Sequence, residues 1–83
     1  MKLTAKKYNL VITELLYRLR VTAGITQQQL STILKVQQSY ISKIENGERR
    51  IDLIELREIC KALNSNLTEF VMMLEKELDE TES

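Results

Sequence analysis

The 83 residues, of which 43% are hydrophobic and which carry no formal net charge, suffice for one small globular domain. The chain contains no histidine and a single cysteine, so the commonest general base and the usual ligand sets of a structural zinc site are missing. No apolar stretch reaches the ~18 residues of a membrane span, and we expect a cytoplasmic protein without a metal or a cofactor.

The first predicted helix spans about residues 5 to 23. Apolar residues recur there at intervals of three or four, as on one face of an amphipathic helix. These residues are Tyr8, Ile12, Leu15 and Leu19. Gly24 then offers a C-terminal cap, because glycine adopts the left-handed conformation that ends many helices without steric cost.

Two short helices are predicted next. Thr26, followed three residues later by Gln29, is a capping box that opens the first of them. Its apolar stripe consists of Leu30, Ile33 and Leu34. Lys35 and Val36 form the break. A third helix then runs from about Gln37 to Asn46 and is stopped by Gly47.

Two further helices complete the chain. Asp52 with Glu55 is a capping-box variant that opens a fourth helix. Asn66 marks the start of a fifth helix over about residues 66–80, followed by an acidic tail at residues 81–83. The apolar stripe of the fifth helix consists of Leu67, Phe70, Val71, Leu74 and Leu78. The sequence therefore predicts one all-α domain of five helices over residues 1–83.

The third predicted helix has a polar outer face. At 100° per residue, Ile41 and Ile44 point to one side. The opposite side carries hydrogen-bonding groups: Ser39, Ser42, Lys43 and Asn46. Gln37 and Gln38 stand at the N-terminus of this helix, where their side chains can project beyond it.

These side chains suit the edges of DNA bases. Glutamine can hydrogen-bond adenine, lysine can donate to guanine, and serine can pair with several edges, each good pair giving ~1 to 3 kcal/mol of discrimination. Arg49 and Arg50 follow the helix and suit phosphates, which position a protein without reading sequence. The pattern indicates a recognition helix for DNA.

Charge is unevenly distributed along the chain. Residues 1–50 carry nine lysines and arginines against three acidic residues, a balance of +6. Residues 51–83 carry three against nine, a balance of −6. The first part can therefore face a polyanion while the second part is repelled by it, which would orient the molecule on DNA.

The run RVTAGITQQQLSTILKVQQSYISKIENGERR, residues 20–50, resembles the helix-turn-helix of the Cro/lambda-repressor-like, XRE-type regulators. Thr26 and Gln27, Leu30, the I-S-x-I-E-x-G ending and the basic residues after it stand at the spacings of that family. The resemblance covers about residues 9–63. It implies a lambda-repressor-like domain in which the second and third helices form the helix-turn-helix.

The resemblance also implies roles for individual residues. Gln27 would contact a phosphate, helped by the backbone N–H groups at the start of the second helix. The implied base readers are Gln37, Gln38, Ser39 and Lys43. The implied contacts to the DNA backbone beyond Gln27 are Ser42, Asn46, Arg49 and Arg50.

An ion pair is expected between Arg20 and Glu45. Glu45 lies about 40° from Ile41 around the third helix, on its inward side, where a carboxylate needs a partner. The resemblance supplies that partner in Arg20, near the end of the first helix.

Three positions depart from the family pattern, one of them Ser31, where alanine usually follows the leucine of the second helix. Gln37 stands where serine or threonine commonly opens the third helix, and glutamine is a poor N-cap. Lys35 stands where the preceding turn often contains glycine. We therefore expect Lys35 in a left-handed conformation, at some energetic cost.

The apolar stripe of the fifth helix leaves two readings open. It can complete the core of one copy, or it can be shared with a second copy, because similar proteins commonly dimerise through their C-terminal helices. We expect a homodimer, since a single recognition helix reads too few bases to be selective. A twofold axis would place two such helices ~34 Å apart on a palindromic operator.

The favoured function is transcriptional regulation by a repressor that binds double-stranded DNA and occludes a promoter. Two alternatives stay open: the antitoxin of a toxin–antitoxin pair, whose acidic C-terminal segment engages a basic toxin, and a protein-interaction module that has kept the fold. An activator would instead need a contact with polymerase. An enzyme is not expected, because the chain offers no histidine, no glycine-rich phosphate loop and no paired-carboxylate pocket.

Overall fold

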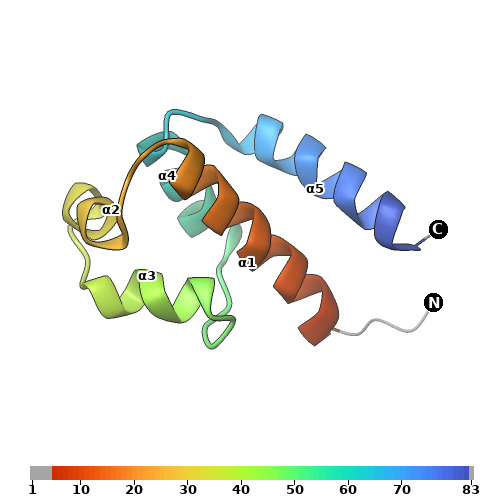
Figure 1. Ribbon diagram of the computed structural model, residues 1–83, viewed down its shortest axis with the longest axis horizontal. Helices are drawn as coiled ribbons and strands as arrows, with labels where there is room; N and C mark the ends of the chain where they lie inside the picture. The colour runs from red at the N-terminus through yellow and green to blue at the C-terminus, as the bar shows by residue number, and fades with distance from the viewer. Residues whose placement is uncertain (1–4, 83) are drawn as a thin grey trace.

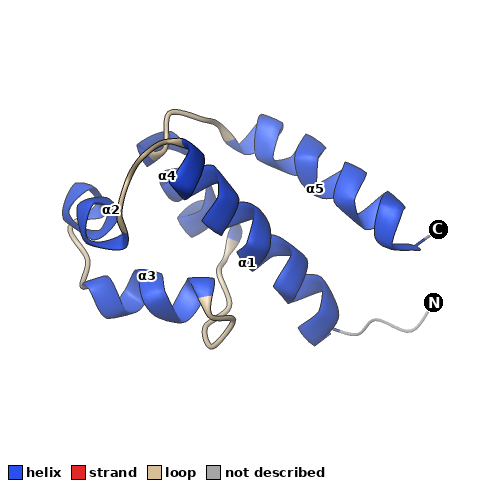
Figure 2. Ribbon diagram, viewed as in Figure 1, coloured by secondary structure: helices blue, strands red, loops and turns tan. Residues whose placement is uncertain are grey.

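The computed structural model describes residues 5–82 as five α-helices (Figure 1). In chain order they are α1 (Ala5–Thr22), α2 (Gln27–Leu34), α3 (Gln38–Glu45), α4 (Leu53–Ala62) and α5 (Leu67–Glu82). No strand occurs among the described residues, and short loops connect the helices (Figure 2). The predicted all-α fold is confirmed. Over residues 5–82, no helix is both long and apolar enough to span a membrane.

Local capping explains where three of the helices begin. At α2 the hydroxyl of Thr26 accepts a hydrogen bond from the backbone N–H of Gln29 (3.0 Å), and the Gln29 side chain accepts one from the N–H of Thr26 (2.8 Å). Asp52 and Glu55 make the same reciprocal pair at α4. At α5 the side-chain oxygen of Asn66 accepts from a first-turn N–H (2.8 Å). All three predicted starts are confirmed.

α3 is one residue shorter at each end than the sequence predicts. Gln37 precedes the helix as its N-cap, and its side chain makes no capping hydrogen bond, in agreement with the poor capping ability of glutamine. Asn46 follows as the C-cap. Gly47 then takes a left-handed conformation with φ +76°, which turns the chain away from the helix axis.

The turn between α2 and α3 depends on a lysine in a left-handed conformation. Lys35 has φ +58° and ψ +43°, as expected from its place in the turn. The N–H of Val36 bonds to the carbonyl of Ser31 (2.9 Å), which closes the last turn of α2 in the manner of a Schellman motif. For a residue with a Cβ, the left-handed conformation costs roughly 1 to 2 kcal/mol.

Lys35→Gly is expected to raise the free energy of unfolding by about 0.5 to 1 kcal/mol. Glycine adopts the left-handed conformation without steric cost, and this gain exceeds the extra backbone freedom that glycine brings to the unfolded chain. Urea denaturation followed by circular dichroism measures the change, with Lys35→Ala as the control because alanine keeps the Cβ. Equal stability of the two variants would show that the turn carries no strain.

The five helices, arranged as in Figure 1, contribute side chains to one apolar core. α2 and α3 form an angled pair at one end of the molecule, while α5 lies along α1 on the other side. α4 packs against both α2 and α5. The most deeply buried side chains come from all five helices: Leu16, Leu30, Ile41, Ile44, Cys60 and Phe70. This core holds α3 by its apolar side and leaves the opposite side to solvent.

The apolar stripe of α5 divides between the core and the surface. The members that pack inward are Leu67, Phe70 and Leu74. Leu78 is half-buried near the end of the helix. Val71 is 38% exposed, and the neighbouring Met72 is 68% exposed. The stripe therefore completes the core of a single copy only in part.

α5 continues into the segment predicted as an acidic tail. The sequence predicts the end of this helix near residue 80, whereas α5 extends to Glu82. The hydroxyl of Thr81 donates to the carbonyl of Glu77 (2.8 Å) within this last turn, and no glycine or proline interrupts it. The assignment of residues 81–82 to a tail is therefore wrong, and Ser83 lies outside the described residues.

Candidate nucleic-acid interface

The side of α3 opposite the core is open to solvent. Ile41 and Ile44 are each 2% exposed and anchor the helix from within. On the outer side the exposed residues are Gln38, Ser39, Lys43 and Asn46. The structure thus presents a row of hydrogen-bonding side chains on a helix whose other side is held rigidly by the core.

Gln37 and Ser42 lie at the margins of this surface. Gln37 is exposed just before the helix. Ser42 is half-buried, and its hydroxyl accepts a hydrogen bond from the side-chain amide of Asn46 at 3.5 Å. Ser42 and Asn46 therefore lie side by side at the C-terminal end of the outer face.

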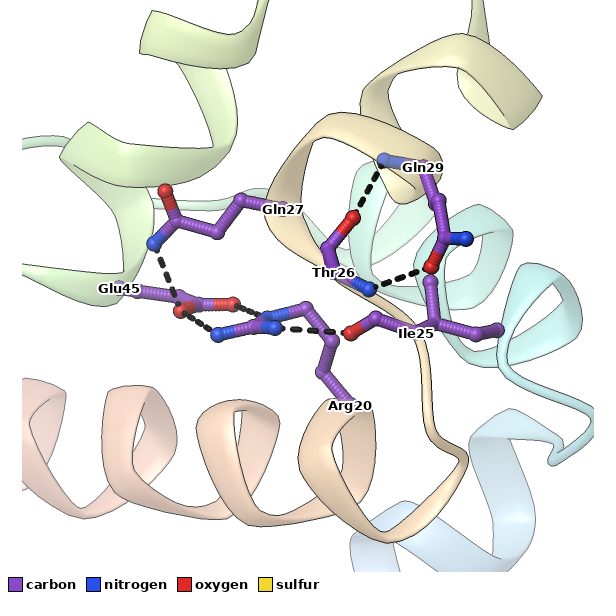
Figure 3. A network of polar contacts seen from close by, with 6 residues as sticks. All are labelled: Arg20, Ile25, Thr26, Gln27, Gln29 and Glu45. Carbon is purple, nitrogen blue, oxygen red and sulfur yellow. Dashed lines mark hydrogen bonds and ion pairs between the residues drawn. The ribbon is translucent and has the colours of Figure 1, made fainter.

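An ion pair joins the end of α1 to the end of α3 (Figure 3). Arg20 Nε lies 2.6 Å from Glu45 Oε2, and Arg20 Nη2 donates to Glu45 Oε1 at 3.0 Å. Arg20 Nη1 donates to the carbonyl of Ile25 at 2.8 Å. The two charged side chains are only 11% and 7% exposed. The hydrogen bond to Glu45 raises the pKa of Arg20, although burial opposes it. The pair expected from the sequence is present.

Gln27 joins the same cluster, a contact that the sequence does not predict. From the first residue of α2, its side-chain amide donates to Glu45 Oε1 at 3.0 Å (Figure 3). The contact orients Gln27, whose second amide hydrogen stays available to another acceptor. No sequence pattern indicates it, because the two residues are 18 positions apart and meet only when α2 packs on α3.

A second cluster links α3, the loop after it and α4. The hydroxyl of Tyr40 donates to Glu55 Oε2, and Arg49 Nη2 lies 2.9 Å from the same oxygen. The guanidinium carbon of Arg49 is 4.6 Å from the centre of the Tyr40 ring. Arg49 Nη1 donates to the carbonyl of Arg50 at 3.0 Å. Arg49, expected at a phosphate, is thus already bound to a carboxylate of its own chain.

These contacts fix the protonation states of the second cluster. Hydrogen bonds from Arg49, the Asp52 backbone and Tyr40 lower the pKa of Glu55 to about 2. Burial and the hydrogen bond to Glu55 raise the pKa of Tyr40 to about 12. At neutral pH the carboxylate is therefore ionised and the phenol protonated, as their hydrogen bonds require.

Positive charge is available around α3. Lys35 before the helix, Lys43 on its outer face and Arg50 after it are all exposed. Among the described residues, no group of three or more histidine, cysteine or acidic side chains is placed to hold a metal ion. The surface is therefore suited to a polyanion that carries hydrogen-bonding edges.

The sequence that forms these helices matches the model of a known protein family. A family model described as helix-turn-helix matches residues 16–70, which include all of α2, α3 and α4. The chain belongs to the XRE-type helix-turn-helix family. Both side-chain clusters lie within the part of the chain that this helix-turn-helix match covers.

Three named proteins are similar to this chain. An XRE-family like protein from Pseudomonas syringae pv. tomato str. DC3000 has a TM-score of 0.80 and 36% identity, over 84% of this chain and 85% of that chain. The restriction-modification controller protein C.Esp1396I has a TM-score of 0.79 and 28% identity, over 86% and 93%. It has also been solved as a tetramer in complex with its natural 35 base-pair operator. The control protein C.MunI from Mycoplasma sp is 32% identical over 53 residues, which cover 64% of this chain and 72% of C.MunI.

Proposed function

We propose that this XRE-type protein is a sequence-specific DNA-binding transcriptional regulator that places α3 in the major groove. The observation that carries the proposal is the exposed polar side of α3, anchored from behind by Ile41 and Ile44. The major groove admits an α-helix, and each base pair presents a distinct pattern of donors and acceptors there. The side chains on the outer face of α3 are of the kinds that read such patterns.

Two kinds of contact are proposed. The base readers are Gln37, Gln38, Ser39 and Lys43. The contacts to the DNA backbone are Gln27, Ser42, Asn46 and Arg50, with Arg49 as a further contact where its ion pair with Glu55 opens. Base contacts select a sequence, whereas backbone contacts fix the register and supply affinity for any sequence. The Nη2 group of Arg49 is bound to Glu55 in the free protein, so this donor reaches a phosphate only when the ion pair opens.

We infer that the regulator acts as a homodimer on a palindromic operator. Val71 and Met72 are apolar and exposed on α5, and α1 separates α5 from α3 in Figure 1. A contact between two copies through α5 would leave both α3 helices free, ~34 Å apart, to enter successive major grooves. The tetramer of C.Esp1396I on its operator is a precedent for assembly of several copies on DNA.

Repression by occupation of an operator is the proposed mode of action. C.Esp1396I is a restriction-modification controller, and C.MunI is a control protein. These relatives favour control of a restriction–modification operon as the biological setting. A regulator bound at its operator occludes the promoter without any catalytic step of its own.

Selection of bound fragments from random duplex DNA tests the proposal. We expect enrichment of a palindrome with half-sites about one helical turn apart, because a twofold dimer presents two copies of α3. Analytical ultracentrifugation of the protein with and without the selected duplex gives the number of copies. Binding without any shared motif would contradict a sequence-specific role and would favour an antitoxin or a protein-interaction module.

A further inference from the structure

Glu55 of α4 binds three partners, one in α3 and two in the loop between α3 and α4. Its Oε2 accepts from Tyr40 of α3 and pairs with Arg49 of the loop after α3. Its Oε1 accepts from the backbone N–H of Asp52 at 3.0 Å, the capping contact at the start of α4. One carboxylate, with a side chain 24% exposed, therefore holds the loop between α3 and α4 to both helices.

Arg49 is held from several sides but remains accessible. Its guanidinium is paired with Glu55, lies over the Tyr40 ring and donates to a backbone carbonyl. Its side chain is nevertheless 40% exposed, and the loop follows directly after the proposed recognition helix. A polyanion that docks on α3 would meet this guanidinium, which is already neutralised by an internal carboxylate.

We propose that Glu55 withholds Arg49 from the DNA backbone and so lowers the affinity of the protein for DNA of any sequence. The inference rests on the proposed DNA-binding function. A carboxylate and a phosphate present similar oxygen pairs to a guanidinium, so they compete for the same donors. Since phosphate contacts supply affinity without reading bases, occupation of Arg49 weakens non-specific binding and leaves the base-reading side of α3 unchanged.

The geometry favours Glu55 over a phosphate in this competition. Glu55 is already oriented by the N–H of Asp52 and by Tyr40, so its pairing with Arg49 requires no further ordering of the carboxylate. A phosphate that takes the Nη2 donor would have to replace this ion pair and preserve or replace the contact of the guanidinium with the Tyr40 ring. Arg49 therefore stays on Glu55 when the protein binds DNA non-specifically.

Glu55→Gln tests the proposal on a mixed-sequence duplex, with binding measured by fluorescence anisotropy. Glutamine keeps an acceptor for the capping N–H of α4 but removes the charge that holds Arg49. We expect tighter binding and a steeper dependence on salt. One additional phosphate contact steepens the slope of log affinity against log salt by about 0.9. Affinity should then fall roughly 3.5-fold more than in the wild-type protein between about 50 and 200 mM salt.

A double-mutant cycle with Arg49→Gln separates the release of Arg49 from a general change in charge. Arg49→Gln alone should bind with the wild-type salt slope, and adding Glu55→Gln to it should leave that slope unchanged. Glu48→Gln is the matched control, because it also removes one negative charge and lies next to Arg49 in the loop after α3, where Glu48 is exposed. The effect of Glu48→Gln on the salt slope should be the same in the wild-type protein and in the Arg49→Gln variant. The proposal is overturned if Glu55→Gln leaves the slope unchanged, or if its effect persists without Arg49.

Thermal unfolding of each variant establishes that it is folded. Should Glu55→Gln unfold, Arg49→Gln tests the proposal by itself. A salt slope less steep than that of the wild-type protein by about 0.9, the value for one phosphate contact, would show that Arg49 already binds phosphate and would overturn the proposal. Wild-type protein that binds no duplex would contradict the proposed function and the inference together. Wild-type protein that binds, with a slope equal to that of Glu55→Gln, would contradict the inference alone.

Discussion

Glu45→Ala is expected to lower the free energy of unfolding by about 3 to 5 kcal/mol. The substitution leaves Arg20, whose side chain is 11% exposed, without its carboxylate, and it leaves the amide of Gln27 without an acceptor. A buried charge without a partner costs far more than an exposed ion pair contributes. For 83 residues the loss is a large share of the ~4 to 12 kcal/mol that domains of this size typically have.

Urea denaturation of matched variants measures this loss. Glu48→Ala is the control, because Glu48 is exposed in the loop just beyond α3, and its removal should change stability by less than about 0.5 kcal/mol. The double variant Arg20→Met/Glu45→Leu should be more stable than Glu45→Ala, because it leaves no charge unpaired. A loss below about 1 kcal/mol for Glu45→Ala would mean that the pair behaves as a surface ion pair.

Lys43→Ala is expected to weaken binding at particular operator base pairs by about 1 to 3 kcal/mol while leaving other positions unchanged. Lys43 is exposed on the outer side of α3, where its ammonium can donate to a guanine edge. Gln38→Ala should act in the same way at a different base pair. Arg50→Ala should instead weaken all sequences alike and lower the salt slope by about one unit, because a phosphate contact reads no base.

Competition binding between the selected operator and its single base-pair variants measures these preferences. Lys61→Ala is the control: this lysine is exposed in the last turn of α4, outside the proposed interface. It should alter neither affinity nor preference. Equal weakening of every sequence by Lys43→Ala would show that Lys43 contacts the DNA backbone and is not a base reader.

The helices could be predicted because their boundaries depend on neighbouring residues. The reciprocal bonds of Thr26 with Gln29 and of Asp52 with Glu55 join positions three apart. Predictions failed where a local signal was weak or missing. Gln37 caps α3 poorly, and no glycine or proline ends α5 before Glu82. The boundaries of α3 and the end of α5 were therefore misplaced by one or two residues.

The sequence by itself determined the number of helices, their caps and the side of α3 that faces the core, since each follows from residues within a few turns of one another. The tertiary structure alone decided that Gln27 meets Glu45 and that Tyr40 and Arg49 meet at Glu55. It also decided which members of the α5 stripe are buried. These contacts depend on how α2, α3, α4 and α5 pack together, and a periodic pattern within one helix carries no information about the position of its neighbours.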